Sequence, residues 1–205
     1  VLPTYGGPEY ETIATMGSYC GVDDLNAVAL ANQICNMYGL DTIACGATIS
    51  FAMECFEHGL LTLEDTDGID LRFGNAAAVV AMVEKIARRE GLGDLLAEGS
   101  ARVAEKLGPA AKEFVVTVKK TELPAHIPHA KKSLGLIYAV NPFGADHQSS
   151  EHDPMYEEGG AQLYYDRLAL LGLHDVQEPG SMSDEKIRFA YLGEVFYSAL
   201  DTYGL

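Results

Sequence analysis

The chain has 205 residues, 48% of them hydrophobic and 21% charged, which is enough for one large or two small globular domains and excludes a disordered chain. Acidic residues number 30 and basic ones 14, and the formal net charge of −16 excludes nucleic acids and anionic membranes as partners, because both need a positive surface. No uncharged run of about 18 apolar residues occurs, so we expect no membrane-spanning segment.

The first half of the chain is predicted to be helical. Apolar residues recur three and four positions apart in four segments, each bounded by residues that cap or stop helices. The second segment is apolar almost all round, so we expect it to be buried. In chain order the predicted helices are Asp23 or Asp24 to Gly39, Asp41 or Thr42 to His58, Asn75 to Gly91, and Asp94 to Leu107.

The second half begins with the one convincing strand pattern, Phe114–Val118. Two prolines in Leu123–Pro128 exclude a helix interior, so a domain boundary is expected nearby. Residues 141–160 form a long polar loop of the kind that often carries function. Further helices are expected over Lys131–Val140, Ala161–Leu171, and Ser183 or Asp184 to Tyr203. The elements predict a mainly α, multihelical chain with two helical subdomains, residues 1–118 and 119–205.

The four cysteines are Cys20, Cys35, Cys45 and Cys55, and their spacing matches no CxxC pair, zinc pattern or dense disulfide framework. They are interpreted as buried thiols in a reducing compartment, so we expect a cytoplasmic protein. The chain begins at Val1 without a signal-peptide pattern, which is consistent with a processed chain, a trimmed one or a piece of a longer protein.

Two predicted helices end in nearly the same five residues, Asn36-Met-Tyr-Gly-Leu40 and Asp201-Thr-Tyr-Gly-Leu205. One interpretation is a pair of ordinary glycine C-caps. The other is a pseudo-symmetric pair of sites, each presenting a polar side chain and the backbone after a glycine to one half of a ligand.

These two segments belong to a set of motifs that occur in a fixed order along the chain. In these motifs the chain resembles the tungsten- or molybdenum-dependent aldehyde ferredoxin oxidoreductase family, and the resemblance extends over essentially the whole length of the chain. The other motifs are Gly7–Thr12, Asp23–Leu25, Asp41–Ile43, Phe51–Cys55, Phe73–Asn75, Leu96–Gly99, Glu122–Ala125 and Asp146-His147. The resemblance implies that residues 1–118 are the late part of the family's second domain and residues 119–205 the early part of its third.

The resemblance implies a tungsten or molybdenum bis-pterin cofactor, with each segment approaching one pterin. The implied cofactor-binding residues are Asn36, Gly39, Leu40, Asp41, Asp201, Gly204 and Leu205. Asparagine replaces the usual leading aspartate at position 36, so the first site loses a charge and gains a donor. The family's [4Fe–4S] cysteines lie outside this sequence, so we expect a piece that ends before the last of them, holds no metal ligand of its own and is inactive in isolation.

The resemblance also assigns catalytic roles to Glu11 and His147 in oxidising an aldehyde to a carboxylic acid, with ferredoxin as the electron acceptor. Glu11 would accept a proton from water, and His147 would polarise the carbonyl or transfer a proton. From the residues alone, the favoured interpretation of Glu11 is a capping or surface glutamate, and that of His147 is a solvated loop histidine.

Several alternatives stay open at this stage. His126 and His129 flank Pro128, and the loop that carries them is either part of the active-site funnel or a plain structural loop. Acidic residues and histidines of the polar loop offer a weaker divalent-metal site, with Asp146, His147, Glu151, His152 and Asp153 as its members. The loop Asn141–Ser150 departs from the commoner family form, which favours as an alternative the tungsten subunit of an aromatic acyl-CoA reductase. A non-catalytic helical interaction module is the alternative of another class. A homo-oligomer is possible.

Overall fold

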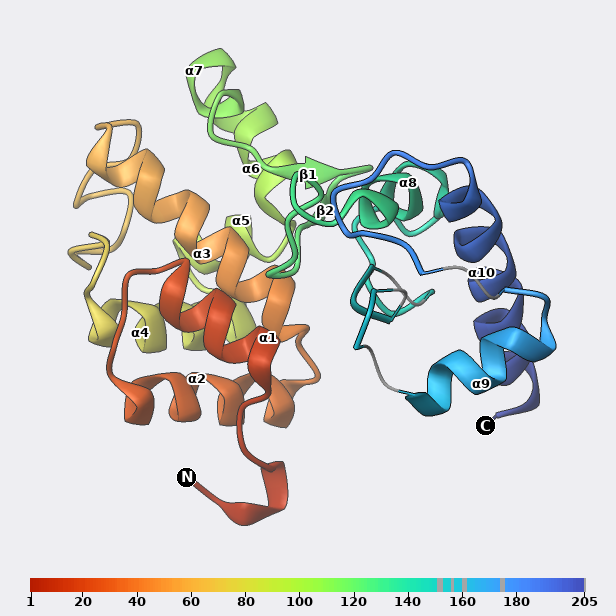
Figure 1. The fold of residues 1–205 in the computed structure, drawn as a ribbon. Helices are drawn as coiled ribbons and strands as arrows, with labels where there is room; N and C mark the ends of the chain where they lie inside the picture. Colours follow the sequence, from red (N-terminus) through yellow and green to blue (C-terminus); the bar gives the residue numbers. More distant parts are fainter. Residues whose placement is uncertain (151–152, 156, 160–161, 174–175, 205) are drawn as a thin grey trace. The chain divides into compact units, whose positions relative to one another are not determined.

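The computed structural model describes residues 1–150, 153–155, 157–159, 162–173 and 176–204, and the chain divides into two compact units, Val1–Ala125 and His126–Leu205. Helices dominate each unit (Figure 1), which confirms the mainly α, multihelical prediction. The first unit contains the 3-10 turn η1 (Pro3–Tyr5), α1 (Tyr10–Ile13), the π-helical turn η2 (Ala14–Ser18), α2 (Leu25–Tyr38), α3 (Thr42–Glu57), α4 (Ala76–Arg88), α5 (Leu92–Leu96), α6 (Ser100–Leu107), α7 (Pro109–Lys112) and the strands β1 (Thr117–Val118) and β2 (Thr121–Glu122). The second contains α8 (Lys132–Val140), the 3-10 turn η3 (Asp153–Met155), α9 (Gln162–Leu170) and α10 (Glu185–Tyr203).

Local capping fixes the starts of the long helices in the first unit, as predicted. The Asp24 side chain accepts hydrogen bonds from two N–H groups in the first turn of α2, and Gly39 ends that helix in the left-handed region at φ 69°. Asp41 and Asn75 cap α3 and α4 in the same way. Because each cap satisfies helix N–H groups with a side chain next to them in sequence, the sequence locates these ends well.

The single helix predicted from Asp94 to Leu107 is wrong, because the segment forms two helices, α5 and α6. Gly99 separates them with a left-handed φ of 86°. A new helix begins at Ser100 because its N–H donates to the carboxylate of Glu122, 2.8 Å away. That carboxylate comes from a distant part of the chain, so local periodicity gave no sign of the break. Helix α4 also ends earlier than predicted, at Arg88 rather than Gly91.

The predicted strand Phe114–Val118 is mostly wrong, because only Thr117–Val118 adopt strand geometry. They pair antiparallel with Thr121–Glu122. Lys119 and Lys120 form the connecting turn, with φ of 53° and 68°. Two successive left-handed residues are the geometry of a type I′ hairpin turn, whose twist matches that of the paired strands.

The hairpin belongs to the first unit, which continues to Ala125, whereas the predicted boundary lies between residues 118 and 119. The buried Glu122 side chain accepts hydrogen bonds from Thr48 of α3 and Ser100 of α6, and it thereby ties β2 to the helices. The correspondence of residues 1–118 and 119–205 with two family domains stays a prediction.

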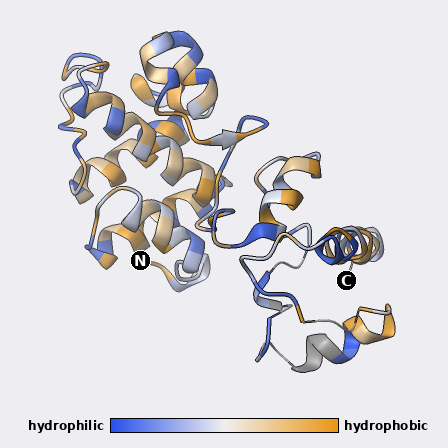
Figure 2. Ribbon diagram, turned by 45° about the horizontal axis from the view of Figure 1, so that its top comes forward, coloured by the Kyte–Doolittle hydropathy of each residue, from blue (hydrophilic) through white to orange (hydrophobic). Residues whose placement is uncertain are grey.

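Helix α3 lies in the core of the first unit and contacts η2, α1, α4, α5, α6 and β2. Apolar residues recur along these helices (Figure 2), and the cysteines Cys20, Cys35, Cys45 and Cys55 are free and buried among them, as predicted. Within the described part of the chain, no helix combines the length and apolar character needed to cross a bilayer.

A buried ion pair organises the second unit. Lys186 of α10, 3% exposed, donates to Asp153 of η3 at 2.6 Å and to the carbonyl oxygens of Glu178 and Pro179 at 2.6 and 2.8 Å. Asp153 also accepts from the hydroxyl of Ser133 in α8 at 2.6 Å. Every donor of the ammonium group therefore has an acceptor, which is the condition under which a buried charge is tolerated.

Candidate functional site

Glu11 lies in the first turn of α1, a short helix that the periodicity of the sequence did not predict. The residue is neither a helix cap nor an exposed side chain, because the cap position is Glu9 and Glu11 is half-buried. Its carboxylate Oε2 accepts a hydrogen bond of 2.7 Å from the backbone N–H of Ala125. Both plain interpretations of Glu11 considered from the sequence are therefore wrong.

The segment that meets Glu11 is held by tyrosines of the same unit. The Tyr19 hydroxyl donates to the carbonyl oxygen of Pro124 at 3.0 Å, and the Tyr10 hydroxyl donates to that of Ala125 at 3.4 Å. Burial raises the pKa of Tyr19, and the nearby negative charge of Glu11 raises it further. Tyr19 therefore stays a neutral donor, and Glu11 sits among groups that orient it.

Threonine hydroxyls attach α1 to the first turn of α3. The hydroxyls of Thr12 and Thr42 are 2.8 Å apart, and the Thr15 hydroxyl lies 3.2 Å from the Thr42 carbonyl oxygen and 2.9 Å from that of Glu11. Thr42 is the first residue of α3, directly after the Asp41 cap. The structure thus packs the helix that carries Glu11 against the end of the first predicted pterin segment.

The first predicted pterin segment, Asn36–Asp41, covers the last residues of α2 and the turn that leads into α3. Gly39 has φ 69° and ψ 36°, and a side chain there would meet no described atom within 4 Å, so the backbone is open to an approaching group. Asp41 Oδ1 accepts from the N–H groups of Ile43 and Ala44 at 2.8 and 3.3 Å. Leu40 is half-buried and packs against the core.

Asn36 uses its side chain as a donor. Its Nδ2 donates to the carbonyl oxygen of Tyr5 in η1 at 2.7 Å. An aspartate in this place could only accept, and it would face the carbonyl oxygen with a negative charge. The asparagine that departs from the family pattern therefore ties η1 to α2.

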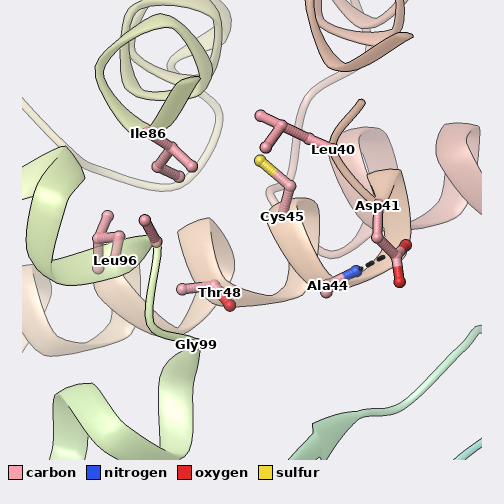
Figure 3. A pocket seen from close by; sticks show the side chains of 9 residues that line it. Leu40, Asp41, Ala44, Cys45, Thr48, Ile86, Leu96 and Gly99 are labelled. Atoms are coloured by element: carbon pink, nitrogen blue, oxygen red, sulfur yellow. Dashed lines mark hydrogen bonds between the residues drawn. The ribbon is translucent and has the colours of Figure 1, made fainter. Parts of the chain in front are cut away.

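A pocket of about 200 Å³ lies behind this turn (Figure 3), and sequence reasoning missed it. Its wall combines apolar side chains with a thiol, a hydroxyl and a carboxylate: Leu40, Asp41, Ala44, Cys45, Thr48, Ile86, Leu96, Ala97 and Gly99. The volume is below the roughly 300–1,000 Å³ of ordinary ligand sites. The pocket has room for a small chemical group, but a pterin is too large for it.

The second pterin segment ends α10. Gly204 has φ 69° and ψ 39°, nearly the values of Gly39, so both segments are glycine C-caps of one geometry. A side chain at Gly204 would also meet no described atom within 4 Å. Asp201 is exposed, and Leu205 lies outside the described residues. The expectation that the two segments bind the two halves of one ligand involves both units and stays a prediction.

His147 is half-buried in the second unit and contacts His126, with ring centroids 4.7 Å apart and ring planes tilted by 44°. His126 Nδ1 lies 3.1 Å from Lys131 Nζ. An ammonium group can only donate, so Nδ1 accepts and His126 carries its proton on Nε2. Gln148 Nε2 lies 3.1 Å from His147 Nε2. His129 is exposed and takes part in neither the contact between the two histidine rings nor the contact with Lys131.

The divalent-metal interpretation of the polar loop loses one of its members, Asp153. Asp153 is buried and occupied by Lys186 and Ser133, and Asp146 Oδ1 accepts from the N–H of Gln148 at 2.9 Å in a local turn. Glu151 and His152 lie outside the described residues. An ammonium group 2.6 Å from Asp153 already neutralises the charge that a cation would need.

The cysteines present do not fit an iron–sulfur cluster. Burial raises the pKa of the Cys20 thiol to about 12 and that of Cys55 to about 11. A hydrogen bond with Cys35 and then burial raise the pKa of Cys45. A cubane cluster needs cysteine sulfurs that converge on one point. Among the described residues, no three cysteines bring their sulfur atoms together at a metal-binding distance.

Sequence comparison places the chain among known proteins. The family described as "Aldehyde ferredoxin oxidoreductase, domains 2 & 3" matches residues 2–205. The tungsten-containing aldehyde ferredoxin oxidoreductases of Thermococcus kodakarensis and Pyrococcus furiosus are 39% and 38% identical to it over 208 residues, covering 100% of this chain and 32% of each relative. The chain thus spans about a third of the length of these curated relatives.

A solved structure is similar in fold. The active site complex BamBC of benzoyl coenzyme A reductase, in complex with 1,5-dienoyl-CoA, gives a TM-score of 0.64 at 22% identity, over 91% of this chain and 27% of that one. At this identity the similarity concerns the fold alone. Together with the match over residues 2–205, these comparisons establish that the chain belongs to the aldehyde ferredoxin oxidoreductase family.

Proposed function

We propose that the chain supplies the helical part of the active site of a tungsten- or molybdenum-pterin oxidoreductase that oxidises aldehydes to carboxylic acids and passes the electrons to ferredoxin. The observation that carries the proposal is the Glu11 carboxylate, half-buried, held by the Ala125 N–H at 2.7 Å and packed beside the first pterin segment. A carboxylate in such a place has the geometry of a proton acceptor rather than of a surface charge.

The two glycine turns fit the pterins. Gly39 and Gly204 leave the backbone approachable, and Asp41 and Asp201 stand beside them with exposed carboxylates. Residues 36–41 and 201–205 would hold the two pterins through these groups, with Asn36 contributing its amide oxygen because its Nδ2 is engaged by Tyr5. When bound, the metal centre supplies the two-electron redox chemistry, which no side chain can provide.

Glu11 and His147 would manage the protons of the reaction. An aldehyde and one water become a carboxylic acid with release of two electrons and two protons, and Glu11 would accept a proton from the attacking water. The Ala125 N–H stabilises the carboxylate form that this role needs. His147 would donate a hydrogen bond to the carbonyl oxygen, and its contact with His126 limits the rotation of its ring.

The test uses the full-length protein, expressed anaerobically with tungstate. We expect tungsten or molybdenum together with iron, and reduction of a viologen dye by an aldehyde. Glu11→Gln and His147→Asn should each lower kcat by roughly 100-fold or more, the usual contribution of a general acid or base. Glu9→Gln and His58→Asn are the controls, because both side chains are exposed and the proposed chemistry gives neither a role. Normal turnover in both active-site variants would remove their proposed roles.

The two alternatives give different results in the same experiment. An aromatic acyl-CoA reductase would leave aldehydes unreacted and reduce an aromatic thioester when given a strong electron donor. A non-catalytic interaction module would contain neither tungsten nor molybdenum. The polar loop Asn141–Ser150 bears on the choice of substrate, because it carries His147.

A further inference from the structure

Glu122 is a buried carboxylate to which the chemistry proposed above gives no role. It is 6% exposed, and its Oε1 accepts three hydrogen bonds: from the N–H of Ser100 at 2.8 Å, from the Ser100 hydroxyl at 2.7 Å and from the Thr48 hydroxyl at 3.3 Å. Gly99, which precedes Ser100, has no side chain to cap α6. Glu122 therefore caps α6 from a distant segment, and the helix N-terminus offsets its charge.

The backbone N–H of Ala125, which donates a hydrogen bond to Glu11, comes three residues after Glu122. Pro124 lies between them with its φ fixed by the ring, and a residue before proline is held extended, so Leu123 and Pro124 add little freedom. The carbonyl oxygen of Pro124 is held by the Tyr19 hydroxyl at 3.0 Å. The segment between Glu122 and Ala125 is therefore short and stiff.

We propose that Glu122 is a positioning residue for Glu11: through residues 122–125 its side-chain oxygen fixes the place of the Ala125 N–H, and thereby the orientation of the Glu11 carboxylate. The inference rests on the proposed catalytic role of Glu11. The length of the Glu122 side chain is the quantity that matters, because all three of its hydrogen bonds end on one oxygen.

Two substitutions in the full-length enzyme separate the effect of the length of the Glu122 side chain from the effect of its charge. Glu122→Gln keeps an acceptor oxygen at the same reach and should keep kcat within about threefold. Glu122→Asp keeps the charge and shortens the reach by about 1.5 Å, one carbon–carbon bond. It should lower kcat by roughly 10- to 100-fold, since a misplacement of about 1 Å costs that much. Glu105→Asp is the matched control, because Glu105 is an exposed glutamate that pairs with Lys120 of the same hairpin at 2.9 Å.

Hydrogen exchange gives a measure that is independent of activity. In Glu122→Asp the amide of Ala125 should exchange at least tenfold faster than in the wild type, while in Glu122→Gln and Glu105→Asp it should not change. Unchanged exchange in Glu122→Asp would overturn the proposal whatever the role of Glu11. If Glu122→Asp fails to fold, Ser100→Ala, which removes the donor at 2.7 Å, carries the same test, and the Ala125 amide should then exchange about tenfold faster.

A double-mutant cycle identifies the path of the effect. If Glu122 acts through Glu11, Glu122→Asp should lower the kcat of Glu11→Gln by less than twofold, because the group that it positions is already gone. A further loss of tenfold or more would mean that Glu122 acts on the fold in general, and would overturn the proposal. Full activity of Glu11→Gln would remove the proposed role of Glu11, while the exchange measurement would still decide whether Glu122 positions Ala125.

Discussion

Gly46→Ala tests a close contact between α3 and η2 in the first unit. Gly46 lies within α3, and a Cβ there would lie 2.7 Å from the carbonyl carbon of Thr15 and 2.9 Å from its oxygen. These are backbone atoms of η2, so the two elements must separate. Alanine gains about 1 kcal/mol over glycine in a helix. Overpacking costs about 1–3 kcal/mol, and contact with backbone places this site at the upper end. The net loss should be about 2 kcal/mol.

Urea unfolding of the chain, followed by circular dichroism, measures that loss. Gly135→Ala is the control, because it lies in α8 and its Cβ would meet only Pro128 Cβ, at the ordinary distance of 3.4 Å. The control should match or exceed the wild-type stability by up to about 1 kcal/mol, the gain in helix propensity. If Gly46→Ala is as stable as Gly135→Ala, the contact between α3 and η2 is not as tight as the structure has it.

Two further predictions concern buried ionisable groups. Burial raises the pKa of the Cys20 thiol to about 12 from an ordinary value of 9.0, so between these pH values the unfolded chain loses a proton that the folded chain keeps. The free energy of unfolding should therefore fall by up to about 4 kcal/mol between these pH values. Unfolding measured over a series of pH values should show a shallower fall in Cys20→Ala than in the wild type. The same dependence on pH in both proteins would contradict the raised pKa of Cys20. Lys186→Met leaves the Asp153 carboxylate buried and unpaired, so unfolding should show a loss of about 3–5 kcal/mol. Adding Asp153→Asn should recover part of it, and no recovery would mean that the ion pair is not the cause.

The sequence alone predicted the elements whose ends depend on neighbouring residues. Asp24, Asp41 and Asn75 each bond to N–H groups in the turn that follows them, so cap and helix share one stretch of sequence. The break between α5 and α6 depends on a carboxylate 22 residues away, and no periodicity carries that information. The helix of Tyr10–Ile13 is too short for a periodic pattern, and its packing against α3 stabilises it instead.

The candidate site shows the same limit at longer range. Motif resemblance selected Glu11 from the sequence, but the partner that orients it, the Ala125 N–H, comes 114 residues later. Every residue except proline carries a backbone N–H, so nothing in the identity of Ala125 marks it as a partner. Tyr19 and Glu122 could have been suspected only as polar residues beside motif positions, because their roles depend on the tertiary fold.

Glu11 and Glu122 are the same residue type in one unit, and the difference between them shows what determines a role. Glu122 is 6% exposed and receives three hydrogen bonds on one oxygen, so moving or protonating it would disturb the start of α6 and the hairpin together. Glu11 is half-buried and is held through Oε2 by a backbone N–H. A proton acceptor must change its charge without losing its place, and a backbone N–H meets that condition because it fixes one oxygen while the other can take up the proton. In the proposed function, the rigid Glu122 would therefore complement the reactive Glu11, since Glu122 would hold the N–H partner of Glu11 in place.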